Sequence, residues 1–345
     1  MKEKRSSHKA EFGLPAAFTD MVEAIYSTRT FRVRENGNLS SERPQSTGIA
    51  QGCPLSPYLF IIVLTVIFDR VDRINGNHPE NVLTDSRAGV LDITYADDTL
   101  LVSSSTQRVQ LQLDTLVATA KSFGLEPNWG KTLHLQVGQA GDLYTPIGTS
   151  VKNVSQAVYL GAVLTGTGGC CAALGRRIGE ARGAFDKLCA VWKHANINKY
   201  EKIKIFEACI SSKLLYSLEC ECLLAADRKR LDGFHCRCLR KVQGFLHPMI
   251  SHISNAEVLA SASAQPISIT LRDRQLSLFG KIAALPDTSL VRRVLFVPGS
   301  VVPAQLVGKR ARGRPKLTWS NTVYALALEA CGHDAQVLHN MFCSS

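Results

Sequence analysis

Two adjacent carboxylates, Asp97 and Asp98, are the residues of this sequence best suited to chemistry. They follow Tyr95 and Ala96 and stand between two apolar, strand-like segments. Neighbouring carboxylates in a tight turn repel each other unless a positive charge lies between them. A divalent cation supplies that charge, and paired Mg²⁺ ions serve nucleotidyl transfer in this way. Taken alone, an exposed Asp-Asp turn without a ligand is the commoner explanation.

A glycine-rich loop precedes the carboxylates, and its presence favours a ligand-binding site over an exposed turn without a ligand. Its sequence, TGIAQGCPLSP, covers residues 47–57. Gly48 and Gly52 let the backbone approach a ligand closely, and Gln51 offers a donor and an acceptor to a base edge. The alternative is a Gly/Pro-rich loop that only caps a core helix. The two motifs in this order favour a binding site over that alternative.

The elements expected to position these motifs come from the spacing of apolar residues. Residues 106–123 and the apolar stretch 57–71 read as helices, and the segments beside the Asp pair read as strands. Three further patterns complete the first half. They are a helix over 15–26, a strand over 30–34 closed by a turn at 35–38, and strands over 133–137 and 157–164.

Beyond residue 169 the pattern changes to helices. Apolar residues recur at helical spacing in four stretches, and residues 297–316 read as a loop or linker. The stretches start at Leu174, Ile203, Leu231 and Leu271. We therefore expect an α+β first part and a helical second part.

Charge and cysteine content restrict the class of protein. The net charge is +11, which favours a polyanionic partner, nucleic acid before a membrane surface. From Gly233 to Ser345 there are 13 Lys/Arg and 5 Asp/Glu, so this third carries +8 of that charge. Eleven cysteines without a secretory leader indicate reduced thiols. Packed cysteines are the favoured reading of the pairs Cys220/Cys222 and Cys236/Cys238, with a zinc site as the alternative.

The basic start of the chain has no apolar segment after it, and the most apolar run, residues 59–68, is half a membrane span. We expect an intracellular protein, the nucleus included, and neither secretion nor a membrane partner.

These motifs together resemble the reverse transcriptases of non-LTR (LINE-type) retrotransposons. The resemblance rests on QGCPLSPYLF and YADDTLLVS, and continues through GLEPNWGKT, VYLG, FHCRCLRKV and GKRARGRPKLTW. It implies RNA-directed DNA synthesis with Mg²⁺, deoxynucleoside triphosphates, an RNA template and a DNA primer or duplex. It also implies an incomplete right-hand polymerase palm over 1–168, an all-α thumb over 169–290, and a basic linker and C-terminal extension over 291–345.

The resemblance carries roles to individual residues. Asp97 and Asp98 would be catalytic metal ligands, and Lys131 would lie near the triphosphate, unless it is a surface lysine after a turn. Substrate contacts are implied for Gln51, Gly52, Tyr95, Tyr159 and Gly161, with residues 159–161 forming a hairpin that grips the primer. Nucleic-acid contacts are implied for Arg176, Arg177, Arg182, Arg310, Arg312 and Arg314. Arg312-Gly-Arg-Pro also resembles an AT-hook core, although a solvated basic linker is the commoner explanation.

One departure from the family concerns a further aspartate, within a segment resembling D-x-x-K-A-F-D that precedes a phrase like FGLP. Here only eleven residues precede Phe12-Gly-Leu-Pro15, and Asp20 lies after it. We therefore expect this chain to extend no primer. Three interpretations remain: a polymerase completed from elsewhere, a non-catalytic nucleic-acid-binding remnant, or a translated fragment of a decayed element. The departure favours the last two.

Overall fold

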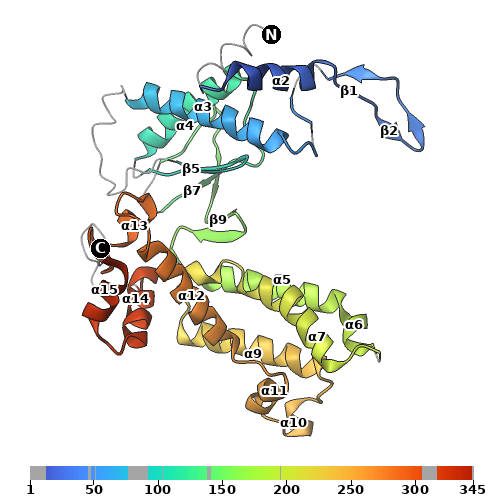
Figure 1. The fold of residues 1–345 in the computed structure, drawn as a ribbon, viewed down its shortest axis with the longest axis vertical. Coiled ribbons are helices and arrows are strands. Elements are labelled where there is room, and N and C mark those ends of the chain that lie inside the picture. The colour runs from blue at the N-terminus through green and yellow to red at the C-terminus, as the bar shows by residue number, and fades with distance from the viewer. Residues whose placement is uncertain are drawn as a thin grey trace. The chain divides into compact units, whose positions relative to one another are not determined.

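The computed structural model describes residues 13–45, 48–50, 52–76, 92–103, 105–137, 141–194, 196–304 and 317–343 (Figure 1). The chain divides into two compact units. The first comprises residues 1–134 and 139–153, and the second comprises residues 135–138 and 154–345. The first mixes helices with short strands and the second is mainly helical, so the described fold is mixed α and β, as expected.

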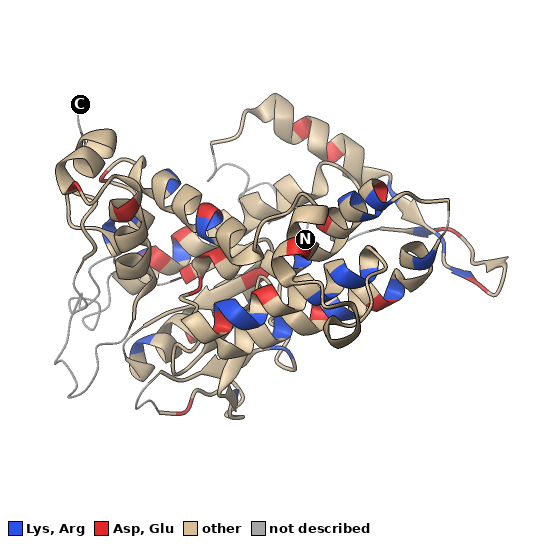
Figure 2. Ribbon diagram, turned by 90° about the horizontal axis from the view of Figure 1, so that it is seen from below, with Lys and Arg blue, Asp and Glu red and all other residues tan. Residues whose placement is uncertain are grey.

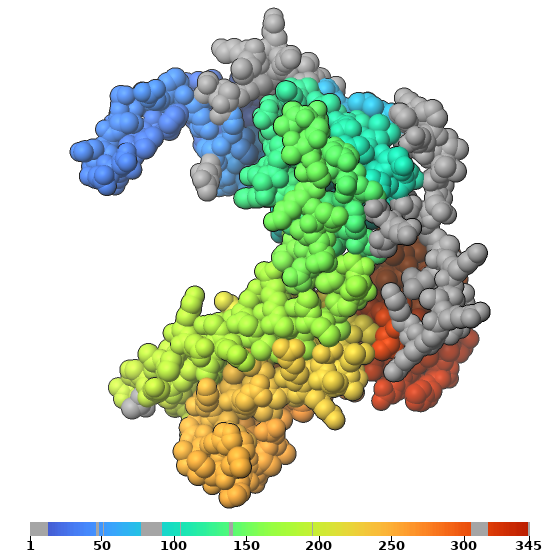
Figure 3. All heavy atoms as spheres, turned by 180° about the vertical axis from the view of Figure 1, so that it is seen from behind, coloured from blue at the N-terminus to red at the C-terminus, as the bar shows by residue number. Residues whose placement is uncertain are grey.

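The first unit begins with helix α2 (Ala16–Ser27) and an arm of four two-residue strands. Strand β1 (Thr30–Phe31) pairs antiparallel with β4 (Arg43–Pro44), and β2 (Arg34–Glu35) pairs with β3 (Asn38–Leu39). Asn36 and Gly37 have positive φ angles, which closes the predicted turn. Every strand residue of the arm is exposed, and Figure 3 shows the arm standing away from the rest of its unit.

Two long helices, α3 (Ser56–Gly76) and α4 (Thr106–Ser122), pack against each other in the first unit. The Ser105 hydroxyl caps α4 by accepting a hydrogen bond from the amide of Arg108. Gly124, with φ +78°, ends the helix, and the Leu125 amide donates to the Ala120 carbonyl. Between these helices in sequence lies the hairpin of β5 (Asp92–Tyr95) and β6 (Asp98–Leu101).

Strands β7 (Leu133–Leu135) and β8 (Lys152–Val154) each cross the sequence boundary between the units. The segment 141–151 between them packs on α4. The Tyr144 amide donates to the Gln110 side chain, whose Nε2 donates back to the Tyr144 carbonyl, both at 2.8 Å. Leu143 and Val151 join Leu113 of α4 in the buried cluster of the first unit.

The second unit opens with a hairpin of β9 (Gln156–Tyr159) and β10 (Ala162–Thr165). Apolar spacing predicted a single strand over 157–164, whereas the family resemblance implied a hairpin at 159–161, and a hairpin is what forms. Residues 160 and 161 take positive φ angles and turn the chain back on itself. Helices follow: α5 (Cys171–Lys187), α6 (Cys189–Lys193), α7 (Lys199–Phe206), the π-helical turn η2 (Glu207–Ser211) and α8 (Ser212–Leu215).

The largest core lies in this second unit, around helix α9 (Ala225–Val242). Leu231, Phe234 and Cys238 are buried on α9, as their helical spacing predicted. Capping boxes at Asn198/Glu201 and Ser254/Glu257 fix the starts of α7 and of α11 (Asn255–Ser261). The remaining elements here are η3 (Leu218–Cys220), α10 (Pro248–Ser251) and α12 (Ile267–Ala283).

The C-terminal region contains more structure than the sequence indicated. Helices α13 (Leu290–Leu295), α14 (Trp319–Ala330) and α15 (Ala335–Cys343) surround a second core centred on Phe279 of α12. Residues 297–304 form a loop, as predicted, yet Val301 within it is buried. Trp319 Nε1 donates to the Glu219 carbonyl at 2.6 Å. Residues 317–343 therefore form helices α14 and α15. The spacing of their apolar residues did not predict these helices.

Of the helices described, none combines the length and apolar character needed to cross a membrane. Figure 2 shows that basic residues are spread along the helices, with acidic residues between them.

Candidate functional site

Asp97 and Asp98 lie at the tip of a two-stranded hairpin, as predicted. Tyr95 pairs with Asp98, so Ala96 and Asp97 form a two-residue turn. Ala96 has φ +51°, a left-handed conformation that costs a residue with a side chain about 1–2 kcal/mol. Tyr95, Asp97 and Asp98 are all exposed. The turn therefore presents two carboxylates and one aromatic ring to solvent.

The base of this hairpin is anchored to α4. Leu101, the last residue of β6, packs against the buried cluster that contains Leu113, together with Val109 and Val117. Asp92, at the opposite end from the turn, is partly buried, and burial raises its pKa. Burial, followed by the charge of Asp92, likewise raises the pKa of Asp72 on α3. The acidic tip is thus held on an anchored base.

Both glycines of the glycine-rich loop have left-handed backbone conformations. Gly48 and Gly52 have φ angles of +77° and +84°. The Ser56 hydroxyl donates to the Ala50 carbonyl at 2.7 Å and lies 3.0 Å from the hydroxyl of Tyr26 on α2. Gln51 lies outside the described residues.

Cys53 lies in the same loop, and its thiol pKa is lowered to about 7. The largest cause is a hydrogen bond with the backbone of Leu55. Hydrogen bonds with the side chains of Tyr26, Ser56 and Arg29 lower the pKa further. A thiol with this pKa is substantially ionised at neutral pH.

Lys131 is exposed at the end of a turn. Its amide donates to the Asn128 carbonyl at 2.9 Å, and the neighbouring Trp129 packs on the buried cluster of the first unit. Trp129 therefore anchors the turn while the lysine side chain faces solvent. This geometry suits either a ligand contact or a surface lysine.

The predicted primer-contacting residues and arginines belong to the second unit, where Gly161 and Arg177 are brought together. Arg177 Nη2 donates to the Gly161 carbonyl, and Nη1 forms a 2.7 Å ion pair with Glu180. The Arg177 side chain is only 7% exposed, which leaves little of it for a ligand. Arg176 also pairs with Glu180, at 2.8 Å, and Arg182 is exposed. Tyr159 is half-buried.

Arg310, Arg312, Arg314 and the rest of the AT-hook-like segment lie outside the described residues. The predicted residues that are described fall into two groups. Gly52, Tyr95, Asp97, Asp98 and Lys131 belong to the first unit; Tyr159, Gly161, Arg176, Arg177 and Arg182 belong to the second.

The carboxylate oxygens of Asp97 and Asp98 match the hard oxygen ligands that Mg²⁺ prefers. Within the described ranges, no group of three or more His, Cys, Asp or Glu side chains is arranged to hold a metal. Mg²⁺ is commonly held by one or two carboxylates, with water and substrate phosphates filling its other positions. The donor set of the turn fits that pattern.

All eleven cysteines are free thiols. Burial raises the pKa of Cys238 to about 12 and that of Cys170 to about 11, so both thiols are protonated. Cys236 and Cys238 lie in the core of α9, consistent with ordinary packing.

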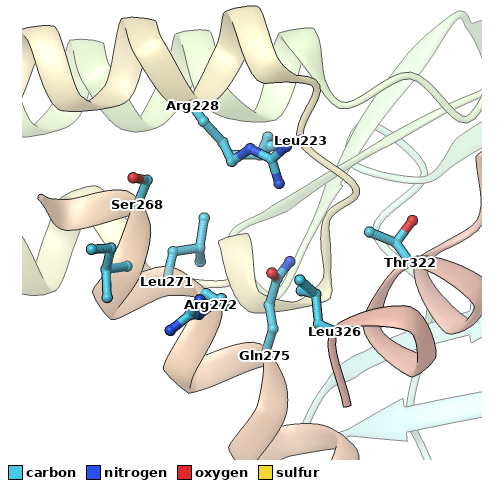
Figure 4. A pocket seen from close by; sticks show the side chains of 9 residues that line it. Leu223, Arg228, Ser268, Leu271, Arg272, Gln275, Thr322 and Leu326 are labelled. Atoms are coloured by element: carbon cyan, nitrogen blue, oxygen red, sulfur yellow. The ribbon is translucent and has the colours of Figure 1, made fainter. Parts of the chain in front are cut away.

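A small pocket is lined by residues of α9, α12 and α14 (Figure 4). Ser268 donates to Asp232 at 2.7 Å, Gln275 donates to the Glu221 carbonyl at 2.9 Å, and Thr322 donates to the Thr318 carbonyl at 2.8 Å. These three polar side chains already have partners, so we assign the pocket to helix packing.

Sequence patterns did not indicate Tyr216, Glu180 or the role of Leu160. The Tyr216 hydroxyl donates to the Leu160 carbonyl at 3.0 Å, across 56 positions of the chain. No local pattern announces such a contact.

Comparison of the sequence with known proteins finds a matching family. Residues 2–164 match the family described as reverse transcriptase (RNA-dependent DNA polymerase). The chain is also similar to the retrovirus-related Pol polyprotein from type-2 retrotransposable element R2DM of Drosophila melanogaster. The two are 27% identical over 169 residues, which cover 46% of this chain and 15% of the relative.

Proposed function

We propose that this chain, a reverse-transcriptase-like protein of non-LTR retrotransposon origin, has at Asp97 and Asp98 the divalent-cation and template–primer site of RNA-directed DNA synthesis. The observation that carries the proposal is the β5–β6 turn, where two adjacent carboxylates stand exposed on an anchored hairpin.

The electrostatics of the turn support a cation. Two neighbouring carboxylates repel each other, and a bound cation relieves that repulsion. When bound, Mg²⁺ would neutralise negative charge on the phosphate oxygens of a nucleotidyl transfer. Asp97 and Asp98 would hold it, while water and the phosphates of a deoxynucleoside triphosphate complete its coordination.

Other residues of the first unit would surround the substrates. Gln51 and Gly52 would line the pocket for the template base and the incoming nucleotide, with Tyr95 beside them. Lys131 would face the triphosphate. Residues 1–168 would then serve as the palm, 169–290 as a helical thumb, and 291–345 as a basic extension that includes α14 and α15.

The helices of the second unit would contact the duplex. Arg176 and Arg182 are the candidates for phosphate contacts, because both sit on α5 and neither is buried. Arg177 is buried and already engaged by Gly161 and Glu180. RNA template and DNA primer are proposed as partners because the matching family is one of RNA-dependent DNA polymerases. The alignment with the R2DM relative covers 15% of that relative's length.

A cation titration tests the carboxylates. Wild type should bind Mn²⁺ in a calorimetric titration, and the cation should raise the melting temperature of the protein because it binds the folded state. The double variant Asp97→Asn/Asp98→Asn should lose both effects. Asp142→Asn, a change at an exposed aspartate of the same unit, is the matched control. Equal Mn²⁺ binding by wild type and the double variant would overturn the proposal.

A second candidate is a non-catalytic nucleic-acid-binding protein, which the net charge of +11 favours. Primer extension on an RNA template with Mg²⁺ separates the two. Product that disappears in Asp97→Asn assigns catalysis to the turn. Cation and hybrid binding without product assigns the binding role.

A further inference from the structure

The turn of the β9–β10 hairpin is held from both sides by side chains distant in the sequence. Tyr159 pairs with Ala162, so Leu160 and Gly161 form a two-residue loop. Arg177 of α5 donates to the Gly161 carbonyl. Tyr216, after α8, donates to the Leu160 carbonyl at 3.0 Å. Both carbonyl oxygens at the tip of the hairpin are thus occupied.

The two clamping side chains also hold each other. The guanidinium carbon of Arg177 lies 4.6 Å from the centre of the Tyr216 ring, a cation–π contact. Glu180 pairs with the remaining side of Arg177 at 2.7 Å. We call Arg177 and Tyr216 the clasp.

The clasp fits only a glycine at the second turn position. A Cβ on Gly161 would lie 3.1 Å from Tyr216 Cε1 and 3.3 Å from Arg177 Nη2. Gly161 also has φ +80°, and Leu160 has φ +48°, which is unfavourable for a leucine. Strained residues of this kind persist only where their surroundings enforce them, and they concentrate at functional sites.

An irregular helix places Tyr216. The helix from α7 continues through the π-helical turn η2 (Glu207–Ser211), and such turns frequently mark functional sites. The chain then breaks at Ser217, with φ +59°, directly after Tyr216. Tyr216 remains half-exposed, so its ring contributes to the clasp more than to the core.

We propose that Arg177 and Tyr216 are positioning residues, which hold in one conformation the β9–β10 hairpin to which the family resemblance assigns the primer. Val158 and Leu160, 51% and 38% exposed, form the hairpin's contact face. This inference rests on the proposed function. Carbonyl oxygens at an open hairpin tip would repel phosphates. The clasp turns them toward a guanidinium and a hydroxyl and leaves an apolar face for sugars and bases.

Two conservative variants test the clasp in the full chain. Tyr216→Phe removes only the hydroxyl bond to Leu160, and Arg177→Lys keeps the charge while losing the guanidinium fork. The matched controls are Tyr200→Phe, an exposed tyrosine of α7, and Arg274→Lys, an exposed arginine of α12. Hydrogen exchange of the amides of residues 158–164 and anisotropy titration with an RNA–DNA hybrid are the two measurements.

Each clasp variant should exchange the hairpin amides about fivefold faster, the effect of one ordinary hydrogen bond, while α9 amides stay unchanged. Affinity for the hybrid should fall by about the same factor. Hybrid affinity equal to wild type in both variants, with or without faster exchange, would overturn the positioning role. A wild-type chain that binds no hybrid would instead overturn the proposed function, and with it the positioning role.

Discussion

Arg177 illustrates how one residue changes meaning once its surroundings are known. The sequence places it beside Arg176 on a basic helix, where both suggest phosphate contacts. The structure separates them: the Arg177 side chain is 7% exposed and pairs with Gly161 and Glu180, whereas the Arg176 side chain is 35% exposed. Helical spacing predicts which residues of α5 face the core and which face solvent. It does not predict that a buried arginine is paired with groups elsewhere in the fold.

His235 on α9 makes stability depend on pH. It is buried, its Nδ1 has no hydrogen-bond partner, and burial lowers its pKa from 6.5 to about 4. The unfolded chain therefore binds a proton more readily than the folded chain between these two values. The free energy of unfolding should fall by up to about 3 kcal/mol as pH drops from 7 to 4.

Urea denaturation at pH 7, 5.5 and 4.5 measures this loss. His235→Leu should flatten the pH dependence within that window, while His339→Leu, a half-buried histidine on α15, should leave it in place. An unchanged slope in His235→Leu would assign the acid loss to other groups.

At the scale of elements, the sequence predicted those whose signals are local. Helices α2, α3 and α4 and the β5–β6 hairpin follow from apolar spacing, prolines and turn residues within each segment. Apolar spacing missed the turn of the hairpin at 156–165, which only the family resemblance implied, and it missed helices α14 and α15, because short apolar runs are ambiguous between strand and helix. Contacts such as Trp319 to Glu219 are 100 positions apart and leave no local pattern.

The C-terminal helices should depend on one aromatic residue. Phe279 is 2% exposed and lies 5.3 Å from Phe296 and 6.4 Å from Phe342, centre to centre. Phe279→Ala should lower the free energy of unfolding by about 3–5 kcal/mol, because the cavity cannot collapse between three helices. Amides of α14 and α15 should then exchange faster than those of α3. Phe245→Ala, a partly buried residue elsewhere in the second unit, controls for loss of a ring.

For the molecule as a whole, charge governs binding to nucleic acid. A net charge of +11 predicts contact with phosphates, so affinity should fall steeply as salt rises, with little preference for sequence. Replacing Arg310, Arg312, Arg314 and Lys316 by alanine should weaken binding. It should also reduce the slope of log affinity against log salt by about one for each phosphate that is no longer neutralised.

Anisotropy titrations at several salt concentrations decide this, with duplex and single-stranded probes. A quadruple variant whose slope equals that of wild type would mean that the tail makes no phosphate contact. Failure of both probes to bind the wild type at low salt would leave the basic surface a solubilising one.

The segment 141–151 has a consequence for the order in which the protein is made. Leu143 and Val151 supply two of the three buried residues in the cluster beneath the hairpin that carries Asp97 and Asp98. Synthesis runs from the N-terminus to the C-terminus. The acidic turn therefore leaves the ribosome some fifty residues before Val151, which completes the cluster at the base of the hairpin. A nascent chain stopped before Val151 would carry both aspartates without the support that fixes them in place.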